Sequence, residues 1–357
     1  MSGDLLSWLE FAEGCRAALT DIMFQKLWLW RVPRLEDVGT DDVSALNIIV
    51  TGPTSGIGTE TARALVLRGA NVFLACRDTN RGRKLRDKLK AEAVDGGVTD
   101  PRIEVMKLDL SSLKSVRDFA AQWEKKGAEP LHVLINNAGI LELGSTTRAT
   151  TVDGLESHVG TNHVGPALLT LLMMPYLRKA GEMYKRGARV VNVSSVLHKI
   201  GSIYRDDPGL EQPGAWGWLK AYAVSKLMDV VYNVELRRRV PESWNVHCMS
   251  LHPGNIMTGI IRTSPRIIQL LYKLVVPMTN ITASEGARAT VYCATSREAP
   301  AEAAMSGTGG YFSSYCAPEK PSRVALDEGV GQWLWDWTLK VAGAAELVAA
   351  TGLDKRC

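Results

Sequence analysis

The sequence lacks the patterns that mark disulfide-bonded, metal-binding and nucleic-acid-binding proteins. Its six cysteines are scattered over 357 residues, and none forms a C-x-x-C pair or a metal-ligand spacing. We therefore predict no metal site, and a reducing compartment facing the cytosol. The net charge of +4 is spread along the chain without a basic run, so we expect no nucleic-acid partner.

Long apolar runs and a secretory leader are also missing. The longest apolar candidate, residues 164–177, is short and is interrupted by Gly165, Pro166 and Pro175. Acidic residues stand near the N-terminus, where a signal peptide would need positive charge and an apolar centre. The expectation is a cytoplasmic protein without a membrane span, with peripheral contact to an intracellular membrane left open.

Short β-branched runs alternate with helical patterns from residue 46 onward, as in parallel βαβ units. Helical patterns such as residues 58–68 and 113–125 lie between these runs. The predicted fold is α/β, a doubly wound parallel sheet of about seven strands in a single domain, which is a Rossmann fold. The runs expected to form strands are residues 46–51, 71–76, 103–108, 131–136, 189–194, 245–251 and 310–313.

The two ends of the chain fall outside this pattern. Residues 1–45 interleave aromatic and aliphatic side chains with basic ones. They predict either an amphipathic helix on a membrane surface or a helix that packs on the domain or on a second subunit. Residues 331–339 form a Trp-rich helical pattern that indicates core packing or a subunit contact. We divide the chain into an N-terminal extension (1–45), a dinucleotide-binding domain (46–325) and a C-terminal helical segment (326–357).

A glycine-rich turn follows the first expected strand and leads into a helix. Its glycines allow a tight turn and a close approach of the backbone to a pyrophosphate, while the helix N-terminus points N–H groups at that anion. The spacing G-x-x-x-G-x-G is neither G-x-G-x-x-G nor a Walker A loop. The residues predicted to contact a dinucleotide here are Gly52, Thr54, Ser55, Gly56, Ile57 and Gly58.

The end of the second strand bears on which dinucleotide is bound. An acidic residue there hydrogen-bonds the ribose of NAD, whereas arginine accommodates the 2′-phosphate of NADP. Cys76 occupies the acidic position and Arg77 follows it, which favours NADP(H) as the cofactor. Asp78 leaves a second interpretation open, because it could contact the ribose or cap the following helix.

Tyr222 and Lys226 are spaced to share one face of a helix. An ammonium group beneath a phenol favours the phenolate form. The pair therefore predicts an acid/base that exchanges a proton with an alcohol or a carbonyl compound.

These motifs occur together in an order that resembles the short-chain dehydrogenase/reductase family. The glycine turn and Tyr222-x-x-x-Lys226 are joined by Asn136-Asn-Ala-Gly139 after the fourth strand and by Ser194-Ser195 after the fifth. The resemblance covers residues 46–315 and is strongest to the retinol dehydrogenase-like branch. The strings that carry the branch resemblance are Ala75-Cys-Arg-Asp78, Thr161-Asn-His-Val-Gly165, Val191-Asn-Val-Ser-Ser195 and Leu251-His-Pro-Gly254.

The resemblance implies a catalytic tetrad of Asn162, Ser195, Tyr222 and Lys226. Tyr222 would exchange the proton on the substrate oxygen, and Ser195 would hydrogen-bond that oxygen as charge develops. Lys226 would also bind the nicotinamide ribose, and Asn162 would hold a water that connects Lys226 to solvent. Tyr222 and Lys226 are therefore expected among the cofactor contacts as well.

Further cofactor contacts follow from the same resemblance. Asp109, with Leu110 beside it, would meet the adenine amino group, although Asp109 could also cap the next helix. Residues 253–258 resemble the family's nicotinamide loop, in which Ile256 would fix the carboxamide and Thr258 would reach a phosphate. The remaining expected contacts are Asn137, Ala138 and Gly139 on the adenine-ribose side, and Pro253 and Gly254 after the sixth strand.

The segment between Ser195 and Tyr222 is longer than is common in the family, although the retinol dehydrogenase-like branch carries a similar insertion. It contains Tyr204, Trp216 and Trp218. These aromatic residues would contribute apolar substrate contacts, or they would simply pack on the core in a surface loop.

The function expected from the motifs and the resemblance is that of an NADP(H)-dependent oxidoreductase. It would act on an apolar carbonyl or alcohol, such as a retinoid-, steroid- or lipid-like aldehyde or ketone. The alternative is an NADP(H)-binding regulatory or interaction protein that docks on a membrane or partner through its aromatic termini. An epimerase or dehydratase on the same fold is a third option. Many relatives form dimers or tetramers, so the resemblance also implies a homodimer as an expectation.

Overall fold

A seven-stranded parallel sheet forms the centre of the protein, in the order β3-β2-β1-β4-β5-β6-β7. The computed structural model describes residues 8–29, 32–39, 42–44, 46–255, 280–353 and 355–356. The observed sheet confirms the predicted fold class, and each strand matches a run expected from the sequence to within two residues at either end. The strands are β1 (Asn47–Thr51), β2 (Asn71–Cys76), β3 (Ile103–Lys107), β4 (Val133–Asn136), β5 (Ala188–Val193), β6 (Val246–Leu251) and β7 (Tyr311–Phe312).

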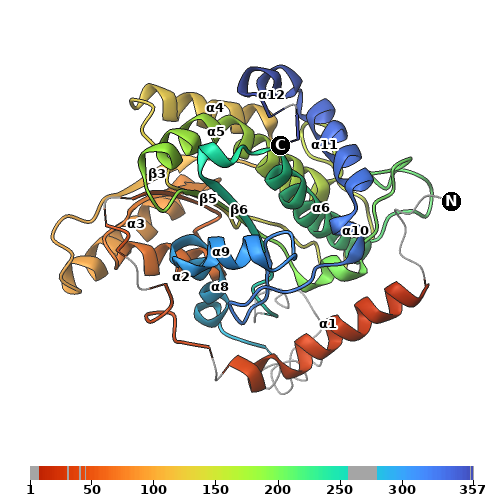
Figure 1. Ribbon diagram of the computed structural model, residues 1–357, viewed down its shortest axis with the longest axis horizontal. Helices are drawn as coiled ribbons and strands as arrows, with labels where there is room; N and C mark the ends of the chain where they lie inside the picture. The colour runs from red at the N-terminus through yellow and green to blue at the C-terminus, as the bar shows by residue number, and fades with distance from the viewer. Residues whose placement is uncertain are drawn as a thin grey trace.

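Helices cover both faces of the sheet (Figure 1). One face carries α2 (Gly56–Val66), α3 (Thr79–Asp95), α8 (Ala283–Thr295) and α9 (Glu298–Met305). The opposite face carries α4 (Leu113–Lys125), α5 (Gly165–Met183) and α6 (Trp218–Arg239), with α11 (Glu328–Ala342) and α12 (Ala345–Thr351) packed outside them. The described short helical segments are a π-helix η1 (Val159–Val164), two 3₁₀ turns η2 (Val196–Ile200) and η3 (Glu242–Trp244), and α10 (Arg323–Leu326).

The strands are apolar on both faces because each face is buried by a helix layer. Successive side chains of a strand point to opposite faces. In β1, Ile49 accordingly packs with the α4–α5–α6 layer, while Ile48 and Val50 pack with the α2–α3–α8 layer. The two cores therefore fix the register of β1, whose carboxyl end leads into the glycine turn.

The C-terminal segment packs against the domain. Val330, Leu334 and Trp335 of α11 belong to the same buried cluster as the residues of α5 and α6. The ring of Trp335 stacks on Tyr232 with 5.5 Å between ring centroids. The Trp-rich pattern seen in the sequence is thus a core-packing pattern on the side of α11 that faces α6.

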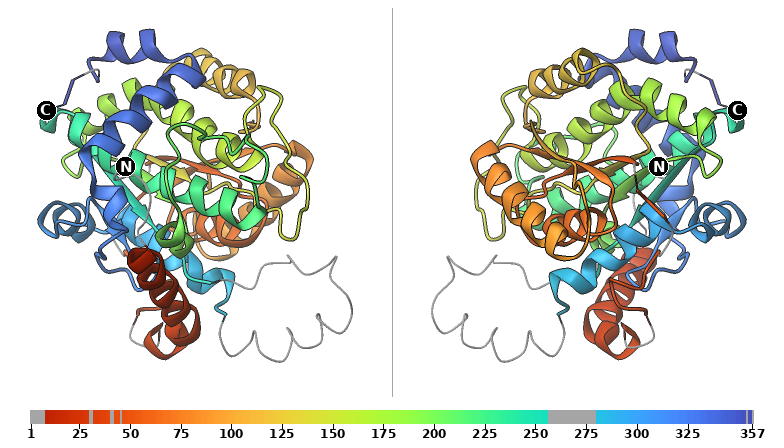
Figure 2. Two further views of the ribbon diagram at one scale, coloured as in Figure 1. Left: turned by 90° about the vertical axis from the view of Figure 1, so that its right-hand side faces the viewer. Right: turned by 90° about the vertical axis from the view of Figure 1, so that its left-hand side faces the viewer.

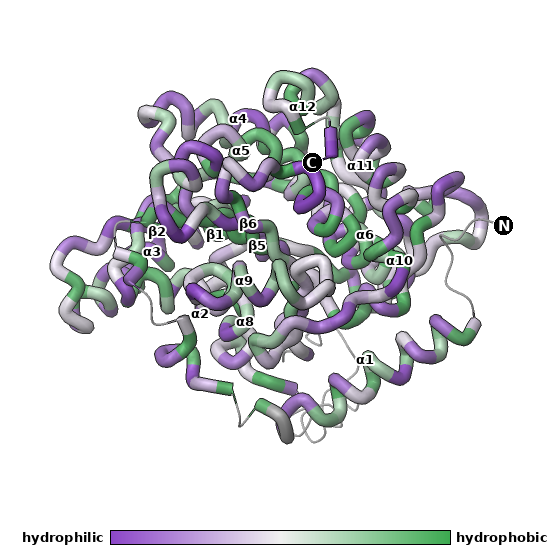
Figure 3. The backbone as a smooth tube through the Cα atoms, in the orientation of Figure 1, coloured by the Kyte–Doolittle hydropathy of each residue, from purple (hydrophilic) through white to green (hydrophobic). Residues whose placement is uncertain are grey.

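An N-terminal helix, α1 (Trp8–Leu29), runs along the outside of the domain (Figures 1 and 2). Ala18 and Gln25 are buried against the domain, whereas Trp8 is 87% and Leu9 78% exposed. Figure 3 shows hydrophobic and hydrophilic residues interleaved along this helix. The helix therefore packs on the domain and still presents apolar side chains outward.

None of the helices in the described part of the chain combines the length and the apolar character that crossing a bilayer requires.

Candidate active site

A cavity of about 400 Å³ opens at the carboxyl ends of β1, β2 and β4. The strand order reverses between β1 and β4, and open α/β sheets bind ligands in the crevice at such a switch point. The residues predicted from the sequence that line this cavity are Gly52, Thr54, Ser55, Gly56, Ile57, Gly58, Arg77, Asp109, Leu110, Asn137, Ala138 and Gly139.

The glycine turn is shaped by close backbone packing. Gly52 has a φ of +64°, and a Cβ on it would lie 2.9 Å from the Cα of Ala138. A Cβ on Gly58 would lie 2.3 Å from the carbonyl oxygen of Gly52, which leaves no room for a side chain. Ser55 precedes α2 without a side-chain cap, so the N-terminal N–H groups of that helix face the cavity uncapped. This arrangement suits an anion such as a pyrophosphate.

Thr51 ties the ends of β1 and β4 together beneath the cavity. Its Oγ1 accepts hydrogen bonds from the backbone N–H groups of Asn137 and Ala138, each at 3.0 Å. The side chain of Asn137 in turn donates to the backbone carbonyl of Thr51 at 2.9 Å. The turn and the strand-4 motif are therefore one hydrogen-bonded unit.

The structure separates the two roles left open for Asp78. The Asp78 carboxylate caps α3 by accepting hydrogen bonds from the backbone N–H groups of Asn80 and Arg81, each at 3.0 Å. The hydrogen bond from Arg81 lowers the pKa of this carboxyl group. The guanidinium of Arg77 is exposed on the cavity wall and makes no hydrogen bond or ion pair with another described residue. Arg81 reaches across to donate to the carbonyl of Thr54.

Asp109 lines the cavity, and its side chain also stabilises the turn that follows it. Its Oδ1 accepts hydrogen bonds from the backbone and the hydroxyl of Ser111, at 3.0 and 2.6 Å. The N-cap of α4 is Ser112, which accepts from Ser115. The capping role considered for Asp109 therefore belongs to Ser112.

Asn162 lies in the π-helix η1, almost completely buried. Its side chain exchanges two hydrogen bonds with Ile140, accepting from the backbone N–H at 2.7 Å and donating to the carbonyl at 3.0 Å. It also donates to the hydroxyl of Ser225 at 3.0 Å. Short π-helical turns often occur at functional sites. Here the turn directs the Asn162 amide between the fourth-strand motif and α6.

Ser195 follows β5 and is half-buried at the start of η2. Its hydroxyl accepts a hydrogen bond from the backbone N–H of Leu197 at 3.2 Å, which orients the side chain. The carbonyl of Ser195 accepts from Nδ1 of His198 at 2.7 Å, while Nε2 of that imidazole accepts from the backbone N–H of Ser322. The contact with Ser322 requires an unprotonated Nε2 and therefore a neutral ring, and burial lowers the pKa of His198 to about 3.

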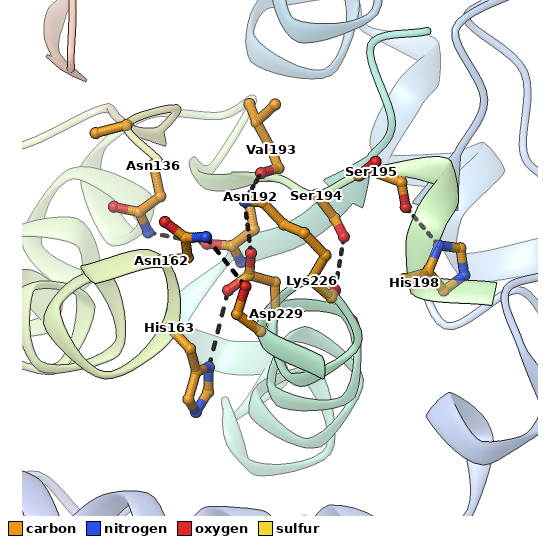
Figure 4. A network of polar contacts seen from close by, with 12 residues as sticks. Asn136, Asn162, His163, Asn192, Val193, Ser194, Ser195, His198, Lys226 and Asp229 are labelled. Carbon is orange, nitrogen blue, oxygen red and sulfur yellow. Dashed lines mark hydrogen bonds and ion pairs between the residues drawn. The ribbon is translucent and has the colours of Figure 1, made fainter. Parts of the chain in front are cut away.

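Lys226 is buried at the centre of a polar network on α6 (Figure 4). Its Nζ donates to the carbonyl of Val193 at 2.9 Å and to Oδ2 of Asp229 at 3.0 Å. Burial opposes the charge of Lys226, but the Asp229 carboxylate and the Tyr222 phenol outweigh that effect and raise the pKa of the ammonium. Tyr222 is half-buried and lies one helical turn before Lys226 on α6.

The dinucleotide cavity and the predicted tetrad adjoin one another. A Cβ placed on Gly139, in the cavity wall, would lie 3.5 Å from Nζ of Lys226 and 3.3 Å from Oδ1 of Asn162. Gly139 of the cavity wall is therefore in close contact with Lys226 and Asn162.

Asp229 and His163 form a layer behind the tetrad that the sequence did not reveal. Oδ1 of Asp229 lies 3.8 Å from Nδ1 of His163 (Figure 4), and Nε2 of that imidazole is 2.9 Å from the hydroxyl of Thr338 on α11. Asp229 follows Lys226 by less than one helical turn. This spacing is the one signal in the sequence that could have indicated the contact between Lys226 and Asp229.

The long segment before Tyr222 is fastened to the core. The indole N–H of Trp216 donates to the buried carboxylate of Glu156 at 3.1 Å, and Nδ1 of His158 lies 2.9 Å from the same oxygen. Burial disfavours the charge of Glu156, but His158 and the other donors lower the pKa of its carboxyl group. The structure therefore agrees with the interpretation in which Trp216 packs on the core.

The other aromatic residues of this segment lie in different surroundings. Trp218 and Tyr204 line an apolar cavity of about 750 Å³, together with Trp8 and Phe11 of α1. The ammonium of Lys220 also lies over the ring of Tyr204, 4.3 Å from its centroid. The structure thus leaves Trp218 and Tyr204 available for apolar contacts.

Most of the remaining predicted positions are also placed. Pro253 and Gly254 directly follow β6, at the same edge of the sheet as Ser195. Ile256 and Thr258 lie outside the described residues. Among the residues that the structure describes, no three His, Cys, Asp or Glu side chains gather as a metal site would require. The cavity residues that the sequence prediction omitted are Thr51, Ala75, Cys76, Asp78, Arg81, Leu108, Ile140 and Thr161.

Comparison with known proteins identifies relatives of this chain. The sequence model of the short chain dehydrogenase family matches residues 46–206. The Arabidopsis thaliana dehydrogenase/reductase SDR family member FEY is 33% identical over 95% of this chain and 89% of its own length. Human retinol dehydrogenase 12 is 36% identical, over 83% of this chain and 86% of its own length.

Solved structures show the same architecture. An uncharacterized protein from Mycobacterium paratuberculosis aligns with 87% of this chain and 98% of its own, with a TM-score of 0.64 and 29% identity. Pseudomonas aeruginosa RhlG, solved as an NADP active-site complex, aligns with 76% of this chain and 95% of its own. Its TM-score of 0.57 at 22% identity extends the likeness of fold.

Proposed function

This chain belongs to the short-chain dehydrogenase/reductase family, and we propose that it transfers a hydride between NADP(H) and an apolar carbonyl or alcohol. The observation that carries the proposal is the contact between the two parts of the site. Gly139 of the dinucleotide cavity adjoins both Lys226 and Asn162. A bound dinucleotide is thereby brought to the residues that handle the proton.

The residues of the cavity fit a dinucleotide. Gly58 leaves space for the backbone to approach a pyrophosphate, and α2 offers its uncapped N–H groups to it. Arg77 supports NADP(H) over NAD(H), because an exposed guanidinium at this strand end suits a 2′-phosphate. Asp78 is engaged with α3 and so is less available to a ribose. When bound, the cofactor supplies or accepts the hydride.

The side chains of the tetrad would divide the proton chemistry. Tyr222 would donate or accept the proton on the substrate oxygen, with the Lys226 ammonium one helical turn away on α6. Ser195 would hydrogen-bond the same oxygen as charge develops on it. Asn162 would hold the backbone at Ile140 and, through water, connect Lys226 to solvent.

The substrate class follows from the relatives and from the surroundings of the site. Retinol dehydrogenase 12 carries its substrate in its name, and this chain shares 36% identity with the human protein. We infer an apolar substrate of the retinoid, steroid or lipid-aldehyde kind, with Tyr204 and Trp218 as candidates for its apolar contacts.

The cofactor assignment is tested by titrating the purified protein with NADPH and NADH while following nicotinamide fluorescence. Tight binding of NADPH with weak binding of NADH supports the role of Arg77. Preference for NADH would overturn the assignment of NADP(H) and place an acidic side chain at the ribose. Turnover assays with all-trans-retinal, a steroid ketone and a long-chain aldehyde would then identify which of these compounds is a substrate.

A second function is favoured by the exposed apolar residues of α1. Leu19 and Met23 are each 58% exposed, and Trp8 is almost fully so. These side chains would suit peripheral contact with an intracellular membrane, a second copy of the chain, or a protein partner of a regulatory NADP(H)-binding protein. Co-sedimentation with phosphatidylcholine–phosphatidylserine vesicles, with Leu19→Ser and Met23→Ser together as the variant, tests membrane contact. Equal sedimentation of both proteins would contradict it.

A further inference from the structure

The helix α1 contacts the connections that follow three neighbouring strands. A Cβ on Gly14 would lie 2.3 Å from the carbonyl oxygen of Lys199, in η2 after β5. Gln25 bonds to Asn255, four residues beyond the end of β6. Asp21 accepts a hydrogen bond from the hydroxyl of Tyr315, after β7, at 3.1 Å. Because the strands are parallel, all three contacts lie at the carboxyl edge of the sheet.

The Gln25 contact is the most specific of the three. The side chain is fully buried, with 0% of its surface exposed. Its Nε2 donates to the carbonyl of Asn255 at 2.9 Å, and its Oε1 accepts from the backbone N–H of the same residue at 2.8 Å. The amide thus pairs with both backbone groups of one residue, as a neighbouring β-strand would.

The backbone held by Gln25 is also constrained from other sides. Gly254 has a φ of +83°, and a Cβ on it would lie 2.8 Å from Oε1 of Gln25. The carbonyl of Asn255 accepts a second hydrogen bond from the N–H of Ile281 at 3.0 Å. The side chain of Asn255 donates to the side chain of Asn280. Gln25 therefore closes a junction between the end of β6 and the approach to α8.

This junction lies at the carboxyl edge of β6, on the side of the switch point opposite β1 and β2. In doubly wound sheets a dinucleotide crosses the switch point, with one mononucleotide on each half of the sheet. The cavity over β1 and β2 contains the glycine turn and Arg77, and so suits the adenosine half. The opposite half lies toward β5 and β6, and the connections after these strands contain Ser195 and Pro253-Gly254.

We propose that Gln25 is a positioning residue for the nicotinamide half of the cofactor, because it fixes the backbone of Gly254 and Asn255 at the end of β6. The N-terminal helix is on this account part of the active-site scaffold, in addition to any surface that it presents outward. The inference rests on the proposed function, since it assumes that NADP(H) occupies the crevice.

The test uses two ligands that separate the halves of the crevice. NADPH engages both halves, whereas adenosine 2′,5′-bisphosphate lacks the nicotinamide and engages only the adenosine half. Calorimetric titration of the full chain gives the dissociation constant of each ligand for the wild type, Gln25→Ala and Met23→Ala. Met23 lies on the same helix, is 58% exposed and serves as the matched control.

Gln25→Ala should weaken NADPH binding by about tenfold, the effect expected for the loss of one or two hydrogen bonds to a positioned backbone. The same variant should bind adenosine 2′,5′-bisphosphate like the wild type, and Met23→Ala should bind both ligands normally. Equal weakening of both ligands would mean that α1 merely stabilises the fold and would overturn the inference. Unchanged NADPH binding would overturn it as well.

A second variant covers the case in which Gln25→Ala does not fold. Gln25→Glu keeps the side-chain length and an acceptor for the N–H of Asn255, but it offers no donor to the carbonyl. It should show the same selective loss of NADPH affinity. Failure of the wild type to bind either ligand would instead contradict the proposed function itself.

Discussion

Lys226 and Asp229 form a buried ion pair on α6, with 3.0 Å between Nζ and Oδ2. The carboxylate also lies 3.8 Å from Nδ1 of His163 in η1. Tyr222 lies one helical turn before Lys226 on the same helix. The charge that Lys226 presents to Tyr222 is therefore partly balanced by Asp229.

The first prediction concerns this balance. Burial opposes the charge of Lys226 and the Asp229 anion offsets that effect, so Asp229→Asn should lower the pKa of the Lys226 ammonium. The limb of the pH–rate profile that depends on this ammonium should move to lower pH. Activity at the optimum should fall by less than about tenfold, since the tetrad itself is intact. A profile of kcat/KM against pH checks this, and an unshifted limb would show that Asp229 has only a structural role.

The second prediction concerns the 2′-phosphate. Arg77→Ala should weaken NADPH binding by about 10- to 100-fold, the range of one hydrogen bond between charged groups, and leave NADH binding unchanged. Arg83→Ala, an exposed arginine of α3 whose guanidinium bonds to Asn80, is the matched control and should change neither affinity. Loss of NADH affinity together with that of NADPH would place Arg77 outside the phosphate site.

The third prediction concerns the glycine turn. Gly58→Ala places a methyl group 2.3 Å from the carbonyl of Gly52 and 2.5 Å from Nδ2 of Asn137, so the turn must open. Cofactor affinity should fall by at least about tenfold, with a loss of about 1–3 kcal/mol in the free energy of unfolding. Gly97→Ala is the control for a loss of stability that leaves the cavity unchanged, because Gly97 has a φ of +90° and no atom within 4 Å of an added Cβ. Normal cofactor affinity of Gly58→Ala would contradict the assigned role of the turn.

The fourth prediction concerns stability in acid. Burial lowers the pKa of His198 to about 3 in the folded protein, from an ordinary value of 6.5. Between these two values the unfolded chain binds a proton that the folded protein does not, so stability falls as the pH falls from about 6.5 toward 3. His198 alone contributes a slope of up to about 1.4 kcal/mol per pH unit in this window.

Urea unfolding of the wild type and of His198→Gln at several pH values measures that slope. The variant should be less stable at pH 7, because it disturbs the bonds to Ser195 and Ser322, but its stability should depend less steeply on pH. His247, whose pKa is also lowered by burial, to about 4, accounts for a residual slope in both proteins. Identical slopes would contradict the assignment of a neutral buried His198.

The regular elements of the fold could be predicted because their signals are local. The strand ending at Thr51 is apolar on both faces, and the glycine turn after it requires its own backbone geometry. The order of βα units then restricts the sheet to a doubly wound arrangement. The same locality placed Tyr222 and Lys226 on one face of α6.

The parts of the site that escaped prediction depend on contacts between distant segments. Asp78 carried the same local signal for a ribose contact and for a helix cap, and only its bonds to α3 distinguish the two. His163 meets Thr338 across 175 positions of sequence, and Gln25 meets Asn255 across 230. No periodic pattern in the sequence indicates such pairs, because the packing of α11 and α1 on the folded domain determines which residues meet.

The turnover of Tyr222→Phe tests the proposed role of Tyr222 as the acid/base most directly. This substitution removes the hydroxyl and leaves Lys226, the cavity and the fold in place. Oxidation of NADPH in the presence of a substrate aldehyde or ketone is measured beside NADPH binding for the variant and the wild type. The variant should bind NADPH normally and lose at least about a hundredfold in kcat. Turnover equal to that of the wild type would contradict the assignment of Tyr222 as the acid/base of this site.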